Sequence, residues 1–125
     1  MRVLTVVGNR PQFVKAAAVS RRLRSTATEV LVHTGQHHDD DLSRVFFDEL
    51  GLPQPEHRLD LGGGSNTTQT ARMLEALEAL IAAEAPDAVL VYGDTNSTLA
   101  GAVAAAQAKV PIAHVEAGMR SFDRT

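Results

Sequence analysis

Two carboxylates in this sequence each stand at the end of a short apolar run, where an acid can take part in proton transfer. Asp94 follows the run Ala88–Tyr92 after a single glycine, and Glu116 directly follows the run 111–115. Runs of this length and composition are typical of strands buried on both faces of a parallel sheet. Open α/β sheets bind ligands at the carboxyl ends of such strands, and a partly dry cleft there tunes acids for proton transfer. We therefore predict that Asp94 and Glu116 are acid/base residues.

Each acid also has a purely structural interpretation. Thr95 and Asn96 follow Asp94, so Asp94 fits equally well as part of the cap of a helix that begins there. Glu116 lies two residues after His114, and alternate residues of a strand share a face. A histidine and a glutamate on one face make this strand more polar than a core strand requires, which favours a functional role for Glu116.

Two basic residues stand near the start of the first expected helix. Gly8-Asn9-Arg10-Pro11 follows the first apolar run, and Lys15 comes about one turn further on. A helix N-terminus attracts anions through its unpaired N–H groups, and Arg10 adds a forked donor suited to phosphate or carboxylate. This pattern predicts an anion site; two solvated surface cations are the equally weighted alternative. The motif is neither Gly-x-Gly-x-x-Gly nor a Walker loop, so it indicates no dinucleotide cofactor and no ATP site.

The run 36–41, Gln-His-His-Asp-Asp-Asp, contains side chains of the kinds that bind metals. Acids at a helix start complement the helix dipole, and no second ligand cluster with suitable spacing occurs in the sequence. We therefore predict no metal site. The glycines at 62–64 lack a strong strand before them and are expected to form a flexible turn.

Strand and helix patterns alternate along the chain with short connections, which is typical of an α/β fold with a parallel sheet and helices on both faces. The Rossmann-like strand order 3-2-1-4-5 would bring Arg10, Asp94 and Glu116 to one rim, with a crevice between Arg10 and Asp94. Gly101 and nearby alanines would let the last helix approach the sheet closely. We expect strands over 2–7, 29–33, 57–59, 88–92 and 111–115. We expect helices over 11–23, 39–50 and 96–108, and a further helix that is capped by Thr67 or Thr68 and ends before Pro86.

Length and composition bound the possible partners. The 125 residues suffice for one domain with a single core. The formal charge of -3, with 12 basic and 15 acidic residues interspersed, predicts neither nucleic-acid nor membrane binding and favours a small-molecule partner. The first apolar run, Val3 to Val7, is too short for a signal-peptide core. The absence of cysteine fits a reducing cytosol, so we expect a soluble cytoplasmic protein.

Four separated motifs, in order and in register, resemble the non-hydrolysing UDP-N-acetylglucosamine 2-epimerase family. The first, Val-Leu-Thr-Val-Val-Gly-Asn-Arg-Pro-Gln-Phe-Val-Lys, ends at Lys15, and the second is Thr-Gly-Gln-His at 34–37. The third is Val-Tyr-Gly-Asp-Thr-Asn-Ser-Thr at 91–98, and the fourth is His-Val-Glu-Ala-Gly-Met-Arg-Ser at 114–121. Together they span the chain from end to end. The resemblance implies that residues 1–125 are an incomplete, Rossmann-like amino-terminal domain of a two-domain, glycosyltransferase-B-like fold whose carboxyl-terminal domain is absent.

The same resemblance implies an activity and a set of roles. The family interconverts UDP-N-acetylglucosamine and UDP-N-acetylmannosamine for cell-envelope polysaccharide synthesis, through elimination of UDP to a bound 2-acetamidoglucal and re-addition of UDP. By position, Asp94 and Glu116 match the family's acid/base and sugar-contacting carboxylates, and Arg10 and Lys15 match substrate-binding residues. A supporting substrate-binding role falls to Gln36 and His37. The chemistry needs no cofactor. A homodimer is expected for the full-length protein.

The resemblance has departures, and two other functions stay open. The family pattern continues after the Arg-Ser-Phe-Asp-Arg stretch with a Pro-Glu-Glu segment and a later catalytic histidine, so we expect the 125-residue chain alone to be inactive. The segment 39–44 differs from the Met-Leu-Asp-Gln-like helix start of members with a regulatory substrate site, which makes substrate activation doubtful. The alternatives are the amino-terminal domain of a glycosyltransferase-B-type sugar transferase and a non-catalytic, flavodoxin-like binding domain.

Overall fold

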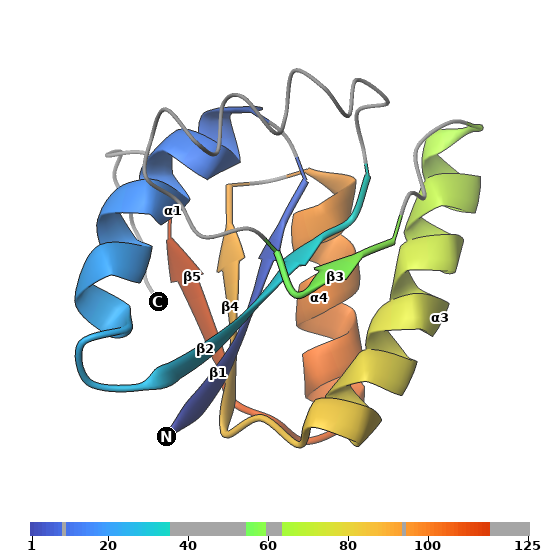
Figure 1. Ribbon diagram of the computed structural model, residues 1–125. Coiled ribbons are helices and arrows are strands. Elements are labelled where there is room, and N and C mark those ends of the chain that lie inside the picture. Colours follow the sequence, from blue (N-terminus) through green and yellow to red (C-terminus); the bar gives the residue numbers. More distant parts are fainter. Residues whose placement is uncertain (9, 36–54, 60–63, 94, 116–125) are drawn as a thin grey trace.

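The computed structural model describes residues 1–8, 10–35, 55–59, 64–93 and 95–115. Within these residues, strands and helices follow one another in the expected alternation (Figure 1). The elements in chain order are β1 (Arg2–Val7), α1 (Arg10–Leu23), β2 (Thr28–His33), β3 (His57–Arg58), α3 (Asn66–Glu84), β4 (Ala88–Tyr92), α4 (Asn96–Gln107) and β5 (Ile112–Val115). The described part of the chain contains no helix with the length and apolar character needed to cross a membrane.

The five strands form one parallel sheet in the order β3-β2-β1-β4-β5. The predicted order 3-2-1-4-5 is therefore confirmed. Helix α1 covers one face of the sheet, and α3 and α4 lie side by side against the other (Figure 1). The predicted fold class, a Rossmann-like parallel sheet with helices on both faces, is confirmed as well.

Strand β4 shows why its sequence is apolar at every position. Val89 and Val91 point into the core under α3 and α4, whereas Leu90 and Tyr92 point into the core under α1. All four side chains are buried. A strand with helices on both faces has no solvent side, so alternation of polar and apolar residues disappears. The interpretation of this run as a strand covered on both faces is confirmed.

Gly101 lets α4 lie directly on the sheet. An ideal β-carbon at this position would stand 2.8 Å from Cγ1 of Val91 and 3.5 Å from Cγ2 of Val6. The first distance is shorter than real β-carbons tolerate, and both valines are buried. The predicted close approach of this helix is therefore confirmed, and it depends on the missing side chain.

Several expected elements differ from the structure or lie outside its description. Helix α3 begins at Asn66 with Ser65 as its N-cap, so the prediction of a cap at Thr67 or Thr68 was wrong by a few residues. Ser65 Oγ accepts a hydrogen bond from the Thr68 N–H at 3.1 Å, which is the usual capping geometry. The predicted strand at 57–59 spans His57–Arg58 only. The helix expected over 39–50 lies outside the described residues, and so do glycines 62 and 63.

A buried carboxylate joins α1 to the sheet. The side chain of Glu29, on β2, is fully buried and accepts hydrogen bonds from three donors. Thr5 Oγ1 lies 2.6 Å away, Arg24 Nε lies 2.9 Å away, and the Ser20 hydroxyl is the third donor. A buried charge is tolerated only when it is paired and hydrogen-bonded, as it is here. The Glu29 cluster therefore fixes how α1 sits on β1 and β2.

We expect Glu29→Ala to lower the free energy of unfolding by about 3 kcal/mol. The Thr5 and Ser20 hydroxyls would lose their acceptor in a buried place, whereas Arg24, with 31% of its side chain exposed, keeps access to water. Urea denaturation followed by circular dichroism measures the change. Glu56→Ala is the control, because Glu56 lies 3.6 Å from Arg24 but is 42% exposed; it also accepts the Leu31 N–H at 2.7 Å, and we expect a loss of about 1 kcal/mol. Equal losses would contradict this account.

A second carboxylate network joins the edge strand β3 to the end of α3. Glu84 pairs with the Arg2 guanidinium and lies 2.8 Å from Nε2 of His57. The hydrogen bonds from Arg2 and then from His57 hold the pKa of Glu84 below its usual value of 4.5. Because these bonds favour the charged carboxylate, they stabilise the fold only while Glu84 is ionised.

The stability difference between the wild type and Glu84→Gln should therefore depend on pH. The direction of the effect follows from proton linkage. A carboxyl group whose pKa is lowered in the folded state stabilises the fold at pH values above its unfolded pKa, about 4.5, and this stabilisation is lost as the pH falls through the folded pKa. We expect the difference to be full near neutral pH and to shrink below about pH 4.5, as measured by urea denaturation across a pH series. Glu78→Gln, the same exchange at an exposed site on α3, is the control. A difference that does not change with pH would refute the proposed cause.

Candidate active site

Strands β1, β2, β4 and β5 all end on one side of the sheet, at Val7, His33, Tyr92 and Val115, and we call this side the carboxyl edge. Strands β1 and β4 are neighbours, yet the chain continues from β1 into α1 on one face and from β4 into α4 on the other (Figure 1). A reversal of this kind opens a crevice in which α/β sheets bind ligands. The arrangement of strands expected around this crevice is confirmed.

Two of the six predicted site residues fall within the described part of the chain. Arg10 is the first residue of α1, although its side chain lies outside the description, and Lys15 is a partly exposed residue further along the same helix. The other four lie outside the described residues: Gln36, His37, Asp94 and Glu116. The meeting of Arg10, Asp94 and Glu116 on one rim stays a prediction. Its support is that β1, β4 and β5, the strands that lead to them, are adjacent.

The turn after β4 is held by the neighbouring strand β5. Gly93 has φ of 72°, a left-handed conformation that glycine adopts without strain. Its N–H donates to the Val115 carbonyl at 2.9 Å, and its carbonyl oxygen lies 2.6 Å from Nε2 of His114. Because a carbonyl oxygen can only accept, the His114 Nε2 must carry the proton. The first bond fixes the N–H group of Gly93, and the second fixes its carbonyl group.

A threonine hydroxyl ties the same turn to the start of α4. Thr95 is the N-cap residue of α4. Its N–H donates to Thr98 Oγ1 at 3.1 Å, and the Thr98 hydroxyl in turn donates to the Tyr92 carbonyl. The end of β4 and the first turn of α4 are therefore joined through one side chain. The sequence places Thr98 near the start of the expected helix over 96–108, but it does not show that Thr98 joins β4 to α4.

Ser97, the remaining hydroxyl of this segment, is buried rather than exposed at the helix start. Its Oγ lies 2.8 Å from Thr34 Oγ1 and 3.7 Å from the sulfur of Met73. Thr34 follows β2, and its N–H donates to the Val7 carbonyl at 3.0 Å. These bonds connect the ends of β1 and β2 with α4 across the carboxyl edge. Sequence reasoning missed this connection because Thr34 and Ser97 are 63 positions apart.

His33 shapes the turn that leads to position 36. Its side chain is buried, and its Nδ1 accepts the N–H of Gly35 at 2.9 Å. An N–H group can only donate, so the Nδ1 of His33 is unprotonated. Gly35 has φ of 79°, which again suits glycine. His33 is therefore a turn-forming residue at the carboxyl edge, whereas the sequence had indicated only the last residue of a strand.

A pocket of about 530 Å³ lies between α4 and β5, beside the turn after β4. Two of the exposed large apolar side chains of the described chain, Leu99 and Ile112, line it. Gly93 and His114 line it as well, so the pocket reaches the carboxyl edge.

Tyr92 is the last residue of β4, but its side chain faces the core under α1, where burial raises the pKa of its phenol. Tyr92 is therefore neutral at physiological pH and is not a candidate base.

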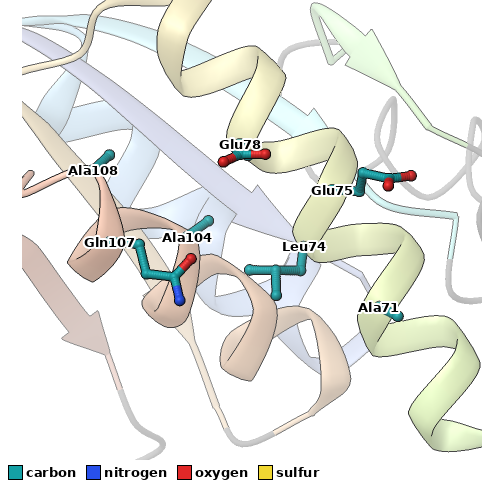
Figure 2. A pocket seen from close by; sticks show the side chains of 7 residues that line it. All are labelled: Ala71, Leu74, Glu75, Glu78, Ala104, Gln107 and Ala108. Atoms are coloured by element: carbon teal, nitrogen blue, oxygen red, sulfur yellow. The ribbon is translucent and has the colours of Figure 1, made fainter.

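A smaller pocket of about 320 Å³ lies between α3 and α4 (Figure 2). Glu75 and Glu78 come from α3, and Gln107 comes from the last turn of α4, so the pocket lies away from the carboxyl edge. Two exposed acids do not form a binding site by themselves. We therefore assign no role in the candidate active site to this pocket.

A family model described as UDP-N-acetylglucosamine 2-epimerase matches residues 21–125. The chain is 54% identical over 125 residues to a UDP-2,3-diacetamido-2,3-dideoxy-D-glucuronate 2-epimerase of Pseudomonas aeruginosa, and the alignment covers 98% of this chain and 35% of the relative. The structure also resembles the crystal structure of Methanocaldococcus jannaschii UDP-GlcNAc 2-epimerase in complex with UDP-GlcNAc and UDP. That match has a TM-score of 0.89 and 42% identity, and it covers 99% of this chain and 34% of the other.

A more distant likeness concerns the fold alone. The glycosyltransferase SsfS6 of Streptomyces sp. SF2575 matches with a TM-score of 0.65 at 19% identity, over 93% of this chain and 39% of the other. The expected glycosyltransferase-B-like architecture agrees with this match. The chain spans about a third of the length of the curated relatives that it matches.

Proposed function

Because the chain belongs to the UDP-N-acetylglucosamine 2-epimerase family, we propose that it supplies one side of an active site that epimerises a UDP-sugar at C2. The substrate pair would be UDP-N-acetylglucosamine and UDP-N-acetylmannosamine, for cell-envelope polysaccharide synthesis. The observation that carries the proposal is the match of the whole described fold to an epimerase crystallised with UDP-GlcNAc and UDP.

The proposed reaction breaks the bond between C1 and the UDP oxygen while a base removes the C2 proton, which gives 2-acetamidoglucal and UDP. UDP then adds back at C1 while a proton is delivered to the opposite face of C2. Asp94 and Glu116 would serve as acid/base and sugar-contacting carboxylates, because proton transfer to and from carbon needs such groups close by. Arg10 and Lys15 would stabilise the leaving diphosphate, and the N-terminus of α1 would add its dipole. Gln36 and His37 would support substrate binding.

A second substrate has a specific observation in its favour. The relative named for UDP-2,3-diacetamido-2,3-dideoxy-D-glucuronate is 54% identical to this chain, and a relative named as a UDP-N-acetylglucosamine 2-epimerase homolog is 52% identical, so both substrates stay candidates. The two sugars share the reacting C2 but differ at C3, where one carries a second acetamido group, and at C6, where one carries a carboxylate. The same acid/base residues would serve both.

The remaining proposals concern the whole protein. We infer a homodimer in the cytoplasm that binds no nucleic acid and no membrane surface. The lack of cysteine and the mixed charge pattern support a reducing compartment and a small-molecule partner. A sugar transferase is less well supported, since the likeness to a glycosyltransferase rests on the fold alone.

The proposal can be tested with a chimera in which residues 1–125 replace the aligned part of the Methanocaldococcus jannaschii enzyme; we call it the epimerase chimera. We expect it to convert UDP-N-acetylglucosamine to UDP-N-acetylmannosamine, as followed by ¹H NMR, with exchange of the C2 proton for solvent deuterium. The diacetamido-glucuronate substrate is assayed in parallel to choose between the two candidates. Residues 1–125 alone are expected to give no product. A folded chimera that epimerises neither sugar would refute the proposal.

A further inference from the structure

His114 makes an unusual contact for an exposed residue of an edge strand. Its Nε2 donates to the carbonyl oxygen of Gly93 at 2.6 Å, from the neighbouring strand β5 to the turn after β4. That carbonyl belongs to the peptide bond that leads into residue 94. The hydrogen bond is therefore one covalent step from the residue that we propose as an acid/base group.

The surroundings of Gly93 show that this peptide needs such a restraint. Glycine has more backbone freedom than any other residue, and Gly93 is in the left-handed region. Its N–H is fixed by the Val115 carbonyl, and the turn is closed on the other side by the Thr98 hydroxyl. The described structure gives the Gly93 carbonyl a single side-chain donor, the imidazole of His114. Without it, the peptide plane between 93 and 94 could rotate.

We propose that His114 is a positioning residue: its imidazole orients the peptide between Gly93 and Asp94 and so sets the direction of the Asp94 carboxylate. This inference rests on the proposed function. A catalytic group must be held within a fraction of an ångström of its productive geometry, and residues that do not touch the substrate often provide that support. His114 acts through Asp94, because its Nε2 is occupied by the Gly93 carbonyl.

The test uses two substitutions in the epimerase chimera. His114→Phe keeps an aromatic ring but removes the donor, and we expect kcat to fall by about 10- to 100-fold while KM changes by less than about 2-fold. His114→Gln keeps an amide donor of similar reach, and kcat should stay within about 3-fold of the wild type. His57→Phe is the matched control, since His57 lies on the distant edge strand β3 and bonds Glu84 of α3, and it should leave kcat unchanged.

A measurement on residues 1–125 tests the geometry independently of catalysis. The ¹³C shift of the Gly93 carbonyl should move in His114→Phe, but not in His57→Phe. An unchanged carbonyl shift, an unchanged kcat in His114→Phe, or an equal loss in His114→Gln would each overturn the assignment. A folded wild-type chimera without activity would instead refute the proposed function and the catalytic consequence with it, and the carbonyl shift would then decide whether His114 holds Gly93.

Discussion

Asp94→Asn is expected to lower kcat of the epimerase chimera by about 100- to 10,000-fold, the range that a positioned acid/base residue contributes. The amide has nearly the same shape as the carboxylate but can neither remove nor deliver the C2 proton. Because Arg10 and Lys15, the proposed substrate-binding residues, are unchanged in this variant, KM should change far less than kcat. Initial rates of epimerisation and of deuterium incorporation at C2 measure the effect, and both should fall together.

The same exchange at the other end of β4 provides the control. Asp87 precedes β4, as Asp94 follows it, and its carboxylate accepts the N–H of Arg2 at 2.8 Å on the opposite side of the sheet. Asp87→Asn therefore tests the cost of losing a carboxylate near this strand without touching the carboxyl edge. We expect kcat of this variant to match the wild type. An Asp94→Asn chimera as active as the Asp87→Asn chimera would remove Asp94 from the reaction.

Gly101→Val should lower the free energy of unfolding by about 3 kcal/mol or more, enough to unfold a large fraction of a marginally stable domain. Even a β-carbon at this position would stand 2.8 Å from Cγ1 of Val91, and valine adds two methyl groups. Val91 and Val6 are buried on a central strand pair, between α4 and the rest of the sheet. Helix α4 would have to lift from the sheet. Thermal and urea denaturation of residues 1–125 measure the loss.

Two further variants separate overpacking from helix propensity. Ala102→Val places the same side chain on the next residue, which lines the pocket beside β5 and is only partly buried, so we expect a loss below about 1 kcal/mol. Val91→Ala removes the methyl groups that Gly101→Val would strike. The double variant should therefore be more stable than the sum of the two single losses predicts. Additive losses would show that the contact with Val91 is not the cause.

The order of the elements and the sheet could be predicted because each depends on local patterns. The run Ala88–Tyr92 is apolar throughout, Pro86 stops the helix before it, and the alternation of elements favours a parallel sheet. Right-handed crossovers leave few strand orders, and the one observed is the common one. The start of α3 was misplaced because several hydroxyl residues occur together there, and only the geometry shows that Ser65 is the cap.

The polar contacts that shape the site and those that anchor α1 could not be predicted, since they join residues distant in the chain. The hydrogen bond between His114 and Gly93 spans 21 positions, and the bond between Thr5 and Glu29 spans 24. Ser20 lies on α1 and donates to the buried Glu29 on β2. A sequence pattern reveals which face is buried, but it does not show which polar groups meet there. That information requires the register of the strands, which the structure provides.

The central strand pair has a consequence for how the chain folds during its synthesis. Strand β1 pairs with β2 nearby, but its other neighbour is β4, and the bond from the Arg2 N–H to Asp87 spans 85 positions. While the ribosome makes the residues between them, one edge of β1 stays open to unwanted pairing with other nascent chains. Closing this long loop delays the central pairing, so we expect its formation to be the slow step of folding.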